Sequence, residues 1–484
     1  MSPVKDQLFN HVVLMLSAHD ALQLGPTWEG ILITGAPGSG KSSCSGRQIA
    51  IGLLNVPNMG GLILTAKAEE TQNWIRYARE CGREKDLIIF NAGSPHCFDP
   101  LHYEWTRPGR GAGDLESIID LFSTLVSMGG KGSSHGHDPF WERGNEQLMR
   151  NVIKLLDLAR EPISIASIDR VIKSLPTRLD QHEEESWQKE SYCAHLINSI
   201  RARQENLTAE QWSDLEVAAQ FAFTKWPAFD ERPRSSLEMT WSGTADKFLF
   251  NPMNRLFCNG KCTFTPEMTT HDGKIIICDF PLLEYGHETG KLVNVLIKLI
   301  FQRSWLRRSL ADSPNPVFLW QDEAQYFVVP KFDNYFQQTC RGSRVTNVLL
   351  TQNILNIAEE LGEPQPGSKT KSLLGNLATK IFHQQNDTET SQYASDQIGR
   401  EYTYLDNYSG GGSSASNHTN FSSGASRQLA HILEPIAFQR LQKPDANSPL
   451  AQAIVYQSGK TFNATVTERN PKGNNYLPVF FSRE

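Results

Sequence analysis

The stretch that most constrains the fold is Gly35-Ala36-Pro37-Gly38-Ser39-Gly40-Lys41-Ser42, which matches the phosphate-binding pattern G-x-x-x-x-G-K-[ST] at every fixed position. Glycines let backbone N–H groups wrap phosphate oxygens, the lysine can reach the β- and γ-phosphates, and the final hydroxyl can bind Mg²⁺. A short apolar run, Gly30-Ile31-Leu32-Ile33-Thr34, predicts a buried strand before the loop, and a helical pattern resumes after Lys41. The sequence therefore predicts a site for ATP and Mg²⁺. The residues expected to contact the nucleotide are Gly35, Ala36, Pro37, Gly38, Ser39, Gly40, Lys41, Ser42 and Ser43.

An acidic pair supplies the expected second half of this site. The apolar run Val317-Phe318-Leu319-Trp320 predicts another buried strand, and Asp322 and Glu323 follow it closely. We expect Asp322, with Ser42, to hold Mg²⁺, and Glu323 to orient and deprotonate the attacking water. A glutamate directly after the aspartate favours ATP hydrolysis over transfer to a separate acceptor. The chain is therefore predicted to be an ATPase.

Three further polar residues are candidates for the reaction. Gln352 follows the predicted strand Val345–Thr351 and is a candidate sensor of the γ-phosphate, although a glutamine at a strand end is as often an ordinary surface residue. Arg341 or Arg344 is a candidate arginine finger for the ATP of a neighbouring subunit. The alternative for each arginine is a solvated surface charge.

Strand and helix patterns alternate up to Phe90 and again from Lys274, which predicts an α/β fold with a mostly parallel, doubly wound sheet. Strand-like runs are missing between about Leu115 and Lys225, where helical spacing dominates, so an all-α insertion is expected there. The predicted divisions are 1–114 for the first part of the nucleotide-binding domain, 115–234 for the all-α insertion, 235–442 for the second part, and 443–484 for a C-terminal tail or hairpin.

Two flanking segments carry weaker patterns. The residues before Pro26 have helical spacing in Val12, Leu14, Leu16 and Leu22. Between Asn407 and Ser426 the chain is rich in Gly, Ser and Asn, which predicts an exposed flexible loop whose role is open.

Composition excludes some classes of protein. The longest apolar stretches fall far short of the roughly 20 residues that span a bilayer, and the first residues lack the pattern of a signal peptide. A cytoplasmic location is expected. The net charge of −6 argues against a general nucleic-acid coat but leaves a local basic channel open. Cys258, Cys262 and His271 permit a zinc site, but no second ligand pair follows, so reduced structural cysteines are favoured.

The order of these motifs resembles the TraG/TraD family of type IV secretion coupling proteins, which are conjugative DNA-transfer ATPases related to FtsK and HerA. Apart from the two nucleotide motifs, the stretches that carry the resemblance are Leu64-Thr65-Ala66-Lys67-Ala68-Glu69, Phe98-Asp99-Pro100-Leu101, Phe140-Trp141-Glu142, Arg341-Gly342, Gln352, Asn376 to Gly399 and Leu433-Glu434-Pro435. The resemblance covers about Gly30 to Gln442. Thr65 stands where the family has an aspartate, and the transmembrane helices usual at the family's N-terminus are missing.

The resemblance implies a RecA-like P-loop domain with an all-α insertion, a ring of six subunits, and DNA or a nucleoprotein as cargo. It also implies secretion-channel or relaxosome proteins as partners, which would recruit the chain to the inner membrane. Two other functions stay open. One is a cytoplasmic DNA-translocating or remodelling ATPase of the FtsK/HerA type, in mobile-element maintenance or defence. The other is an assembly scaffold regulated by ATP, which the intact set of Lys41, Ser42, Asp322 and Glu323 disfavours.

Overall fold

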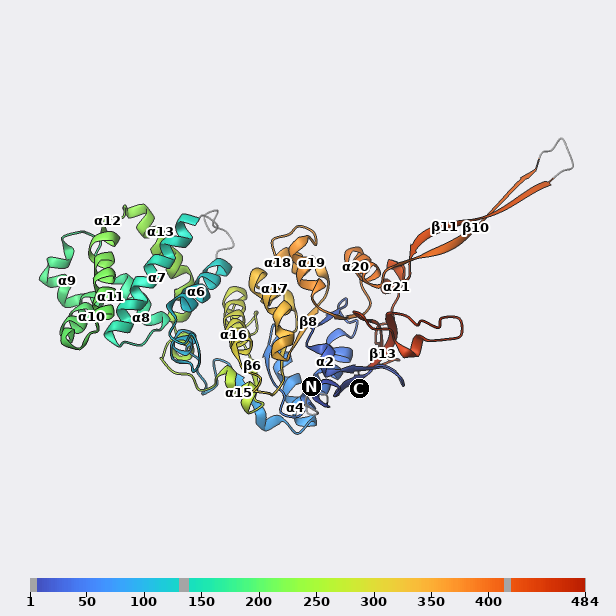
Figure 1. The fold of residues 1–484 in the computed structure, drawn as a ribbon, viewed down its shortest axis with the longest axis horizontal. Helices are drawn as coiled ribbons and strands as arrows, with labels where there is room; N and C mark the ends of the chain where they lie inside the picture. The colour runs from blue at the N-terminus through green and yellow to red at the C-terminus, as the bar shows by residue number, and fades with distance from the viewer. Residues whose placement is uncertain (1–6, 130–138, 413–418, 484) are drawn as a thin grey trace. The chain divides into compact units, whose positions relative to one another are not determined.

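The computed structural model describes residues 7–129, 139–412 and 419–483 (Figure 1). The chain divides into two compact units. The first unit contains Met1–Met59, Trp74–Lys85 and Asn315–Glu484, and the second contains Gly60–Asn73 and Asp86–Pro314. Among the described residues, no helix is long and apolar enough to cross a membrane.

The strands of the first unit follow the order β13-β12-β9-β3-β8-β7. Their bounds are β3 (Ile31–Thr34), β7 (Val317–Gln321), β8 (Val345–Thr351), β9 (Thr379–Phe382), β12 (Leu450–Gln457) and β13 (Tyr476–Ser482). Strand β3 pairs in parallel with β8 on one side and β9 on the other, and β8 pairs in parallel with β7. Every residue of these four parallel strands is buried, including the polar Asn347 of β8 and Lys380 of β9. Since β3 is central, the loop that follows it emerges between the carboxyl ends of β8 and β9.

Helices cover this part of the sheet and bury its apolar faces. They are α2 (Leu24–Thr27), α3 (Arg47–Leu54), the C-terminal part of α4 (Ala68–Glu80), α17 (Pro330–Thr339), α18 (Ile354–Glu360), α19 (Ser368–Gly375), α20 (Thr388–Ile398) and α21 (Pro435–Gln439). One apolar cluster joins Leu32 and Leu349 of the strands to Ile357 and Leu374 of α18 and α19. The strands that carry the phosphate loop are therefore packed into the core of the unit.

The segment before Pro26 is not helical as predicted, but forms an antiparallel pair of strands, β1 (Val12–Met15) and β2 (Ala21–Gln23). Ser17 and Asp20 close the turn between them, because the Ser17 hydroxyl oxygen accepts from the Asp20 N–H at 2.9 Å. The carbonyl oxygen of Val13 lies so close to Gly52 in α3 that a Cβ on this glycine would be 2.0 Å away. Turn residues and packing on α3 thus override the helical spacing.

The Gly/Ser/Asn-rich segment also differs from its prediction. It contributes to two long antiparallel strands, β10 (Arg400–Gly412) and β11 (Thr419–His431), rather than to an irregular loop (Figure 1). Residues 413–418 lie outside the described residues. At the end of the chain, β12 and β13 form a hairpin, and β12 pairs antiparallel with β9. Of the tail and the hairpin expected after residue 442, the structure has the hairpin.

The second unit contains three parallel strands in the order β4-β6-β5. Their bounds are β4 (Gly60–Leu64), β5 (Leu87–Phe90) and β6 (Ile275–Cys278). Between β5 and β6 the chain is helical over α5 (Pro100–Thr106), α6 (Leu115–Gly129), α7 (Pro139–Ala159), α8 (Ile165–Lys173), α9 (Glu185–Glu190), α10 (Tyr192–Arg201), α11 (Ala209–Gln220), α12 (Trp226–Ala228), α13 (Glu231–Leu249), α14 (Met253–Phe257) and α15 (Pro266–His271). Helix α16 (His287–Arg307) follows β6. The helices α6 to α12 and the first turn of α13 fall within 115–234, where the sequence predicts an all-α insertion, and α5, α14 and α15 lie outside that range.

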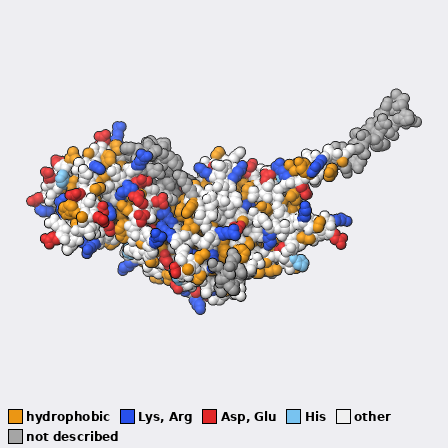
Figure 2. Space-filling model, viewed as in Figure 1, with side chains coloured by type: hydrophobic (Ala, Val, Ile, Leu, Met, Phe, Trp, Pro, Cys, Tyr) orange, Lys and Arg blue, Asp and Glu red, His pale blue; other side chains and the backbone are white. Residues whose placement is uncertain are grey.

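The surface of the inserted helices mixes both signs of charge. Figure 2 shows acidic and basic side chains interspersed over α7 to α13 on the face that it draws. The side chains of Phe140, Trp141 and Glu142, at the start of α7, lie outside the described residues. Such a mixed face is typical of solvated helices, and it does not by itself indicate a nucleic-acid surface.

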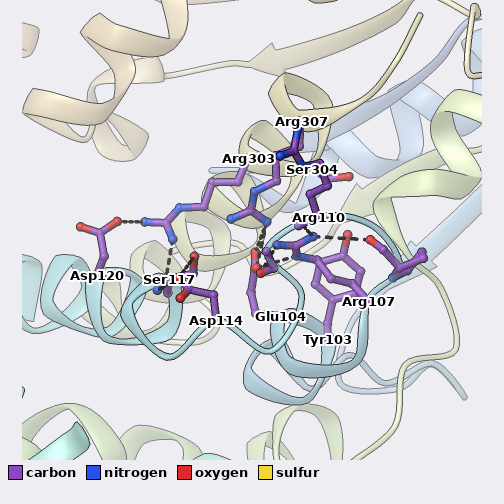
Figure 3. A network of polar contacts seen from close by, with 12 residues as sticks. Tyr103, Glu104, Arg107, Arg110, Asp114, Ser117, Asp120, Arg303, Ser304 and Arg307 are labelled. Atoms are coloured by element: carbon purple, nitrogen blue, oxygen red, sulfur yellow. Dashed lines mark hydrogen bonds and ion pairs between the residues drawn. The ribbon is translucent and has the colours of Figure 1, made fainter. Parts of the chain in front are cut away.

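A buried polar network joins α5 to α16 within the second unit (Figure 3). The carboxylate of Glu104 accepts from Arg107 Nε at 2.9 Å and from Arg307 Nη1 at 2.9 Å, and its side chain is 0% exposed. On a neighbouring turn of α16, Arg303 pairs with Asp120 of α6. Since a buried carboxylate needs such partners, the network fixes the first helices of the inserted domain against α16.

Candidate functional site

The phosphate loop follows β3, and the neighbouring strand ends hold its backbone. Gly35 N–H donates to Thr351 O at the end of β8 (3.3 Å), and Ala36 N–H donates to Gln384 O beyond β9 (2.8 Å). Gly40 has φ +90°, a left-handed conformation that glycine adopts without strain. A π-helical segment begins at Lys41 and continues into α3, so backbone N–H groups face the loop.

The loop residues fit a phosphate ligand. A Cβ on Gly35 would lie 2.3 Å from Ser39 Oγ, so this position accepts only a glycine without rearrangement. The Ser39 hydroxyl is buried and has no hydrogen-bond partner among the described residues, although buried hydroxyls normally have one. Lys41 is buried, and Ser42 and Ser43 are half-buried. A ligand with several acceptor oxygens matches this set of groups.

The carboxylate of Glu323 is the centre of the polar cluster beside the loop. Its Oε1 lies 3.9 Å from Lys41 Nζ and accepts from Gln352 Nε2 at 3.3 Å. Its Oε2 accepts from Gln325 Nε2 at 3.0 Å. The structure therefore brings together Lys41, Glu323 and Gln352, which the sequence places in three separate motifs.

Asp322 precedes this glutamate at the end of β7 and is also buried. Its Oδ1 accepts from the backbone N–H of Glu323 at 3.0 Å. The Glu323 backbone has φ 52° and ψ 51°, a left-handed conformation that is uncommon for a residue other than glycine. Such strain persists only where the surroundings hold it, and it often marks functional residues. Oxygen donors of the kind that Mg²⁺ prefers are available from Asp322 and from the Ser42 hydroxyl.

The end of β9 adds a buried histidine behind the loop. His383 Nε2 and Ser45 Oγ share a hydrogen bond of 2.7 Å, and His383 is 0% exposed. Burial, with a smaller effect of the Lys41 charge, lowers the pKa of His383 to about 3. Beside it, Gln385 Nε2 donates to Thr34 Oγ1 at 2.9 Å. The imidazole is therefore neutral and does not add a second positive charge next to the lysine.

The two candidate arginines lie at the opposite end of β8 from Gln352. They precede the seven residues of this strand, which at about 3.3 Å per residue separates the two ends by roughly 20 Å. Arg341 Nη1 pairs with Glu29 Oε1 at 2.8 Å, and the Arg341 side chain is 62% exposed. The guanidinium of Arg344 lies over the Trp28 ring at 5.8 Å from its centroid. Neither arginine is placed beside the phosphate loop of its own chain.

Sequence reasoning missed three residues of this site: Gln325, Thr351 and His383. Gln325 stands two residues after Glu323, a spacing that could have directed attention to it. Thr351 and His383 carry no local signal, because their positions follow from the pairing of β3 with β8 and β9.

Thr65 and the two cysteines of the possible zinc site lie in the second unit. The Thr65 hydroxyl donates to Cys278 O at 2.9 Å, so it bridges β4 and β6. The thiols of Cys258 and Cys262 donate to the carbonyl oxygens of Phe248 and Asp99, each at 3.5 Å. Within the described part of the chain, no group of three or more His, Cys, Asp or Glu side chains could hold a metal ion.

Comparison with known families bears on the C-terminal part of the first unit. Residues 316–443 match the family model described as the TraM recognition site of TraD and TraG. The resemblance to TraG/TraD proteins is confirmed. The matched TraG/TraD region contains Asp322, Glu323, Gln325, Gln352 and both arginines. It also contains the β10–β11 hairpin. No curated protein sequence is detectably similar to the chain.

The fold resembles that of the bacterial conjugative coupling protein TrwB. An unbound form of TrwBdeltaN70 has a TM-score of 0.60 at 13% identity, and the alignment covers 98% of this chain and 89% of the TrwB chain. TrwB with the ATP analogue ADPNP has a TM-score of 0.58 at 13% identity, with 100% of this chain and 93% of that chain covered. TrwB with ADP and Mg²⁺ has a TM-score of 0.56 at 12% identity, and the alignment covers 100% of this chain and 92% of the TrwB chain. At these identities the similarity establishes the fold, a RecA-like P-loop NTPase with an inserted all-α domain.

Proposed function

We propose that the chain is an ATP-hydrolysing motor of the coupling-protein type, which assembles as a hexamer and moves DNA or a nucleoprotein toward a transfer channel. The observation that carries this proposal is the buried contact between Lys41 and Glu323, 3.9 Å apart beside the phosphate loop. The TraG/TraD match over residues 316–443 supports the cargo and the channel partners. Action from the cytoplasm, with recruitment to the inner membrane by those partners, belongs to the same proposal.

The roles in hydrolysis follow from the chemistry of each group. The loop N–H groups and Lys41 bind the phosphates, and Ser42 and Asp322 would hold Mg²⁺, which neutralises charge on the phosphate oxygens when bound. Glu323 orients a water molecule and takes its proton as the oxygen attacks the γ-phosphorus and the bond to ADP breaks. Gln352, which contacts Glu323 at 3.3 Å, is suited to respond to the γ-phosphate.

A subunit boundary completes the site in this proposal. Arg341 and Arg344 lie roughly a strand length from their own phosphate loop, so either one would act on the ATP of the neighbouring subunit. An arginine supplied in this way stabilises the charge of the transition state. It also links hydrolysis in one subunit to the position of the next, which a motor requires.

The test is ATP turnover of the full chain with and without single-stranded DNA, together with DNA binding at several salt concentrations. We expect turnover that DNA stimulates, and a loss of about 100-fold or more in Lys41→Ala, since this side chain contacts the phosphates. An ATP turnover rate that DNA does not change, in a chain that does not bind DNA, would contradict the DNA-motor role. No turnover under any condition would favour the ATP-regulated scaffold instead.

A further inference from the structure

The side chain of Gln325 makes two hydrogen bonds that connect Glu323 to the end of β8. Gln325 Nε2 donates to Glu323 Oε2 at 3.0 Å, and Gln325 Oε1 accepts from Thr351 Oγ1 at 3.0 Å. Gln325 is 4% exposed, and Thr351 is fully buried at the last position of its strand. The amide is therefore fixed at both ends, and its orientation, with N–H toward Glu323, is set by the carboxylate, which can only accept. The Thr351 hydroxyl, which also lies 3.0 Å from Asn353 O, holds the amide oxygen.

The other oxygen of Glu323 has partners of a different kind. Its Oε1 faces Lys41 Nζ and Gln352 Nε2, the two groups that we propose to engage the phosphates. When ATP occupies the loop, these groups turn to the nucleotide and release Oε1. Gln325 has no such competing ligand, because its amide is held by Thr351 on the protein side. The two oxygens thus differ: one depends on the nucleotide, and the other does not.

We propose that Gln325 is a positioning residue for ATP hydrolysis, which fixes Oε2 of Glu323 so that Oε1 is aimed at the attacking water. This rests on the proposed ATPase function and deepens it. In the step itself, the water oxygen bonds to the γ-phosphorus, the bond to the ADP oxygen breaks, and the water proton passes to Glu323 Oε1. Gln325 takes no part in bond making. It limits the directions that the carboxylate can adopt from a backbone at φ 52°.

A positioning role separates kcat from KM. Gln325 does not contact the phosphates, so its loss should lower kcat and leave KM nearly unchanged. A residue that only supports the fold would instead lower kcat and raise KM together when it is replaced.

The experiment compares steady-state turnover and ATP affinity in the full chain and in three variants. Gln325→Met keeps the size of the side chain and removes the amide, and we expect kcat to fall about 10- to 100-fold, as for other partners that orient a reacting group. KM and the ATP affinity should stay within about twofold, since the phosphates are not contacted. Thr351→Val should act in the same direction with a smaller loss. The double variant should be no slower than Gln325→Met, because both changes break the same chain of hydrogen bonds from Thr351 through Gln325 to Glu323.

Gln337→Met is the matched control. Gln337 is as buried as Gln325, at 4% exposed, but its Nε2 donates to Glu29 O, away from Glu323. It should leave kcat and KM unchanged. A further variant, Gln325→Glu, keeps the shape but replaces the N–H donor by a second carboxylate beside Glu323, and it should lower kcat at least as much as Gln325→Met.

Two results would overturn the role of Gln325 while leaving the ATPase intact. One is unchanged kcat in Gln325→Met beside a fully active unmodified chain. The other is an equal loss of kcat in Gln325→Met and Gln337→Met, with KM raised in both, which would mean that both glutamines only support the fold. Absence of turnover in the unmodified chain would instead contradict the proposed function itself.

Discussion

Lys41 Nζ lies 3.9 Å from Glu323 Oε1, and the two side chains are 10% and 2% exposed. One residue comes from the phosphate loop and the other from the end of β7, with β8 between their strands. Both groups are expected to face the γ-phosphate when ATP is present, so the pair occupies the position where the reaction would take place.

The position of the arginines predicts complementation between two inactive variants. Arg341→Ala should lose most of its turnover if it supplies the finger, a loss of about 10³-fold for such groups, and Lys41→Ala should also be inactive. Mixed one to one, they form boundaries where an intact loop meets an intact arginine, at about a quarter of all boundaries in a random ring. Turnover of the mixture should therefore recover in part.

Mixing Arg344→Ala with Lys41→Ala in the same way decides which arginine acts. Only the arginine that serves as the finger should be inactive alone and recover turnover in the mixture. Arg344 packs on Trp28, and its replacement is expected to cost stability more than turnover. If neither mixture recovers any activity although both proteins assemble, the site is not completed by a neighbouring subunit.

Replacing Glu104 should lower the free energy of unfolding far more than replacing a glutamate of an exposed ion pair. Glu104→Gln leaves Arg107 and Arg307 without their carboxylate, and Arg107 is only 5% exposed in its side chain. Breaking a buried ion pair of this kind costs about 3 kcal/mol, which should appear as a clear drop in the temperature of unfolding. Glu116→Gln breaks the exposed pair with Arg150 and should change the stability by less than about 1 kcal/mol. Equal effects of the two changes would show that the Figure 3 network does not hold α5 to α16.

His383 predicts a loss of stability in mild acid. Its pKa is lowered to about 3 in the folded chain, against about 6.5 in an unfolded one. The unfolded state therefore takes up a proton as the pH falls below 6.5, and the folded state does not until about pH 3. The stability contributed by neutral His383 is complete above pH 6.5 and is lost at up to about 1.4 kcal/mol per pH unit below it.

The measurement is the urea midpoint of unfolding of the first unit between pH 7 and pH 4. His383→Gln, which does not titrate, should show a smaller decline over this range than the unmodified chain. Parallel declines in the two proteins would mean that His383 is not the group responsible.

Several parallel strands can be predicted from the sequence, because β3, β5, β6 and β7 are short runs of mostly apolar residues. Gly35 to Ser42 and Asp322-Glu323 are equally accessible, since they are local patterns with a fixed chemistry. The sequence singles out Gln352 as a candidate sensor of the γ-phosphate, but its 3.3 Å contact with Glu323 is known only from the structure.

The parts of the fold and the site that could not be predicted depend on strand pairing between segments that are distant in the sequence. His383 reaches the phosphate loop only because β9 lies beside β3, and β9 is more than 300 residues further along the chain. The β1–β2 pair was mistaken for a helix, since four apolar residues fit helical spacing while the turn at Ser17 and Asp20 decides the local structure. The β10–β11 strands were mistaken for a loop because their Gly, Ser and Asn residues have low strand propensity, which pairing over thirteen residues on each side overrides. Helix α13 (Glu231–Leu249) continues on both sides of residue 234, where the sequence analysis places the end of the insertion.

The decisive experiment for the catalytic role of Glu323 compares ATP turnover and ATP binding in the unmodified chain and in Glu323→Gln, measured side by side with Mg²⁺ present. Glu323→Gln keeps the shape of the side chain and the loop that holds the phosphates, but it cannot accept the proton of the attacking water. We expect it to bind ATP as tightly as the unmodified chain and to hydrolyse it about 100-fold more slowly or worse. Turnover in Glu323→Gln equal to that of the unmodified chain would contradict the assignment of the Lys41–Glu323 site as the place of hydrolysis.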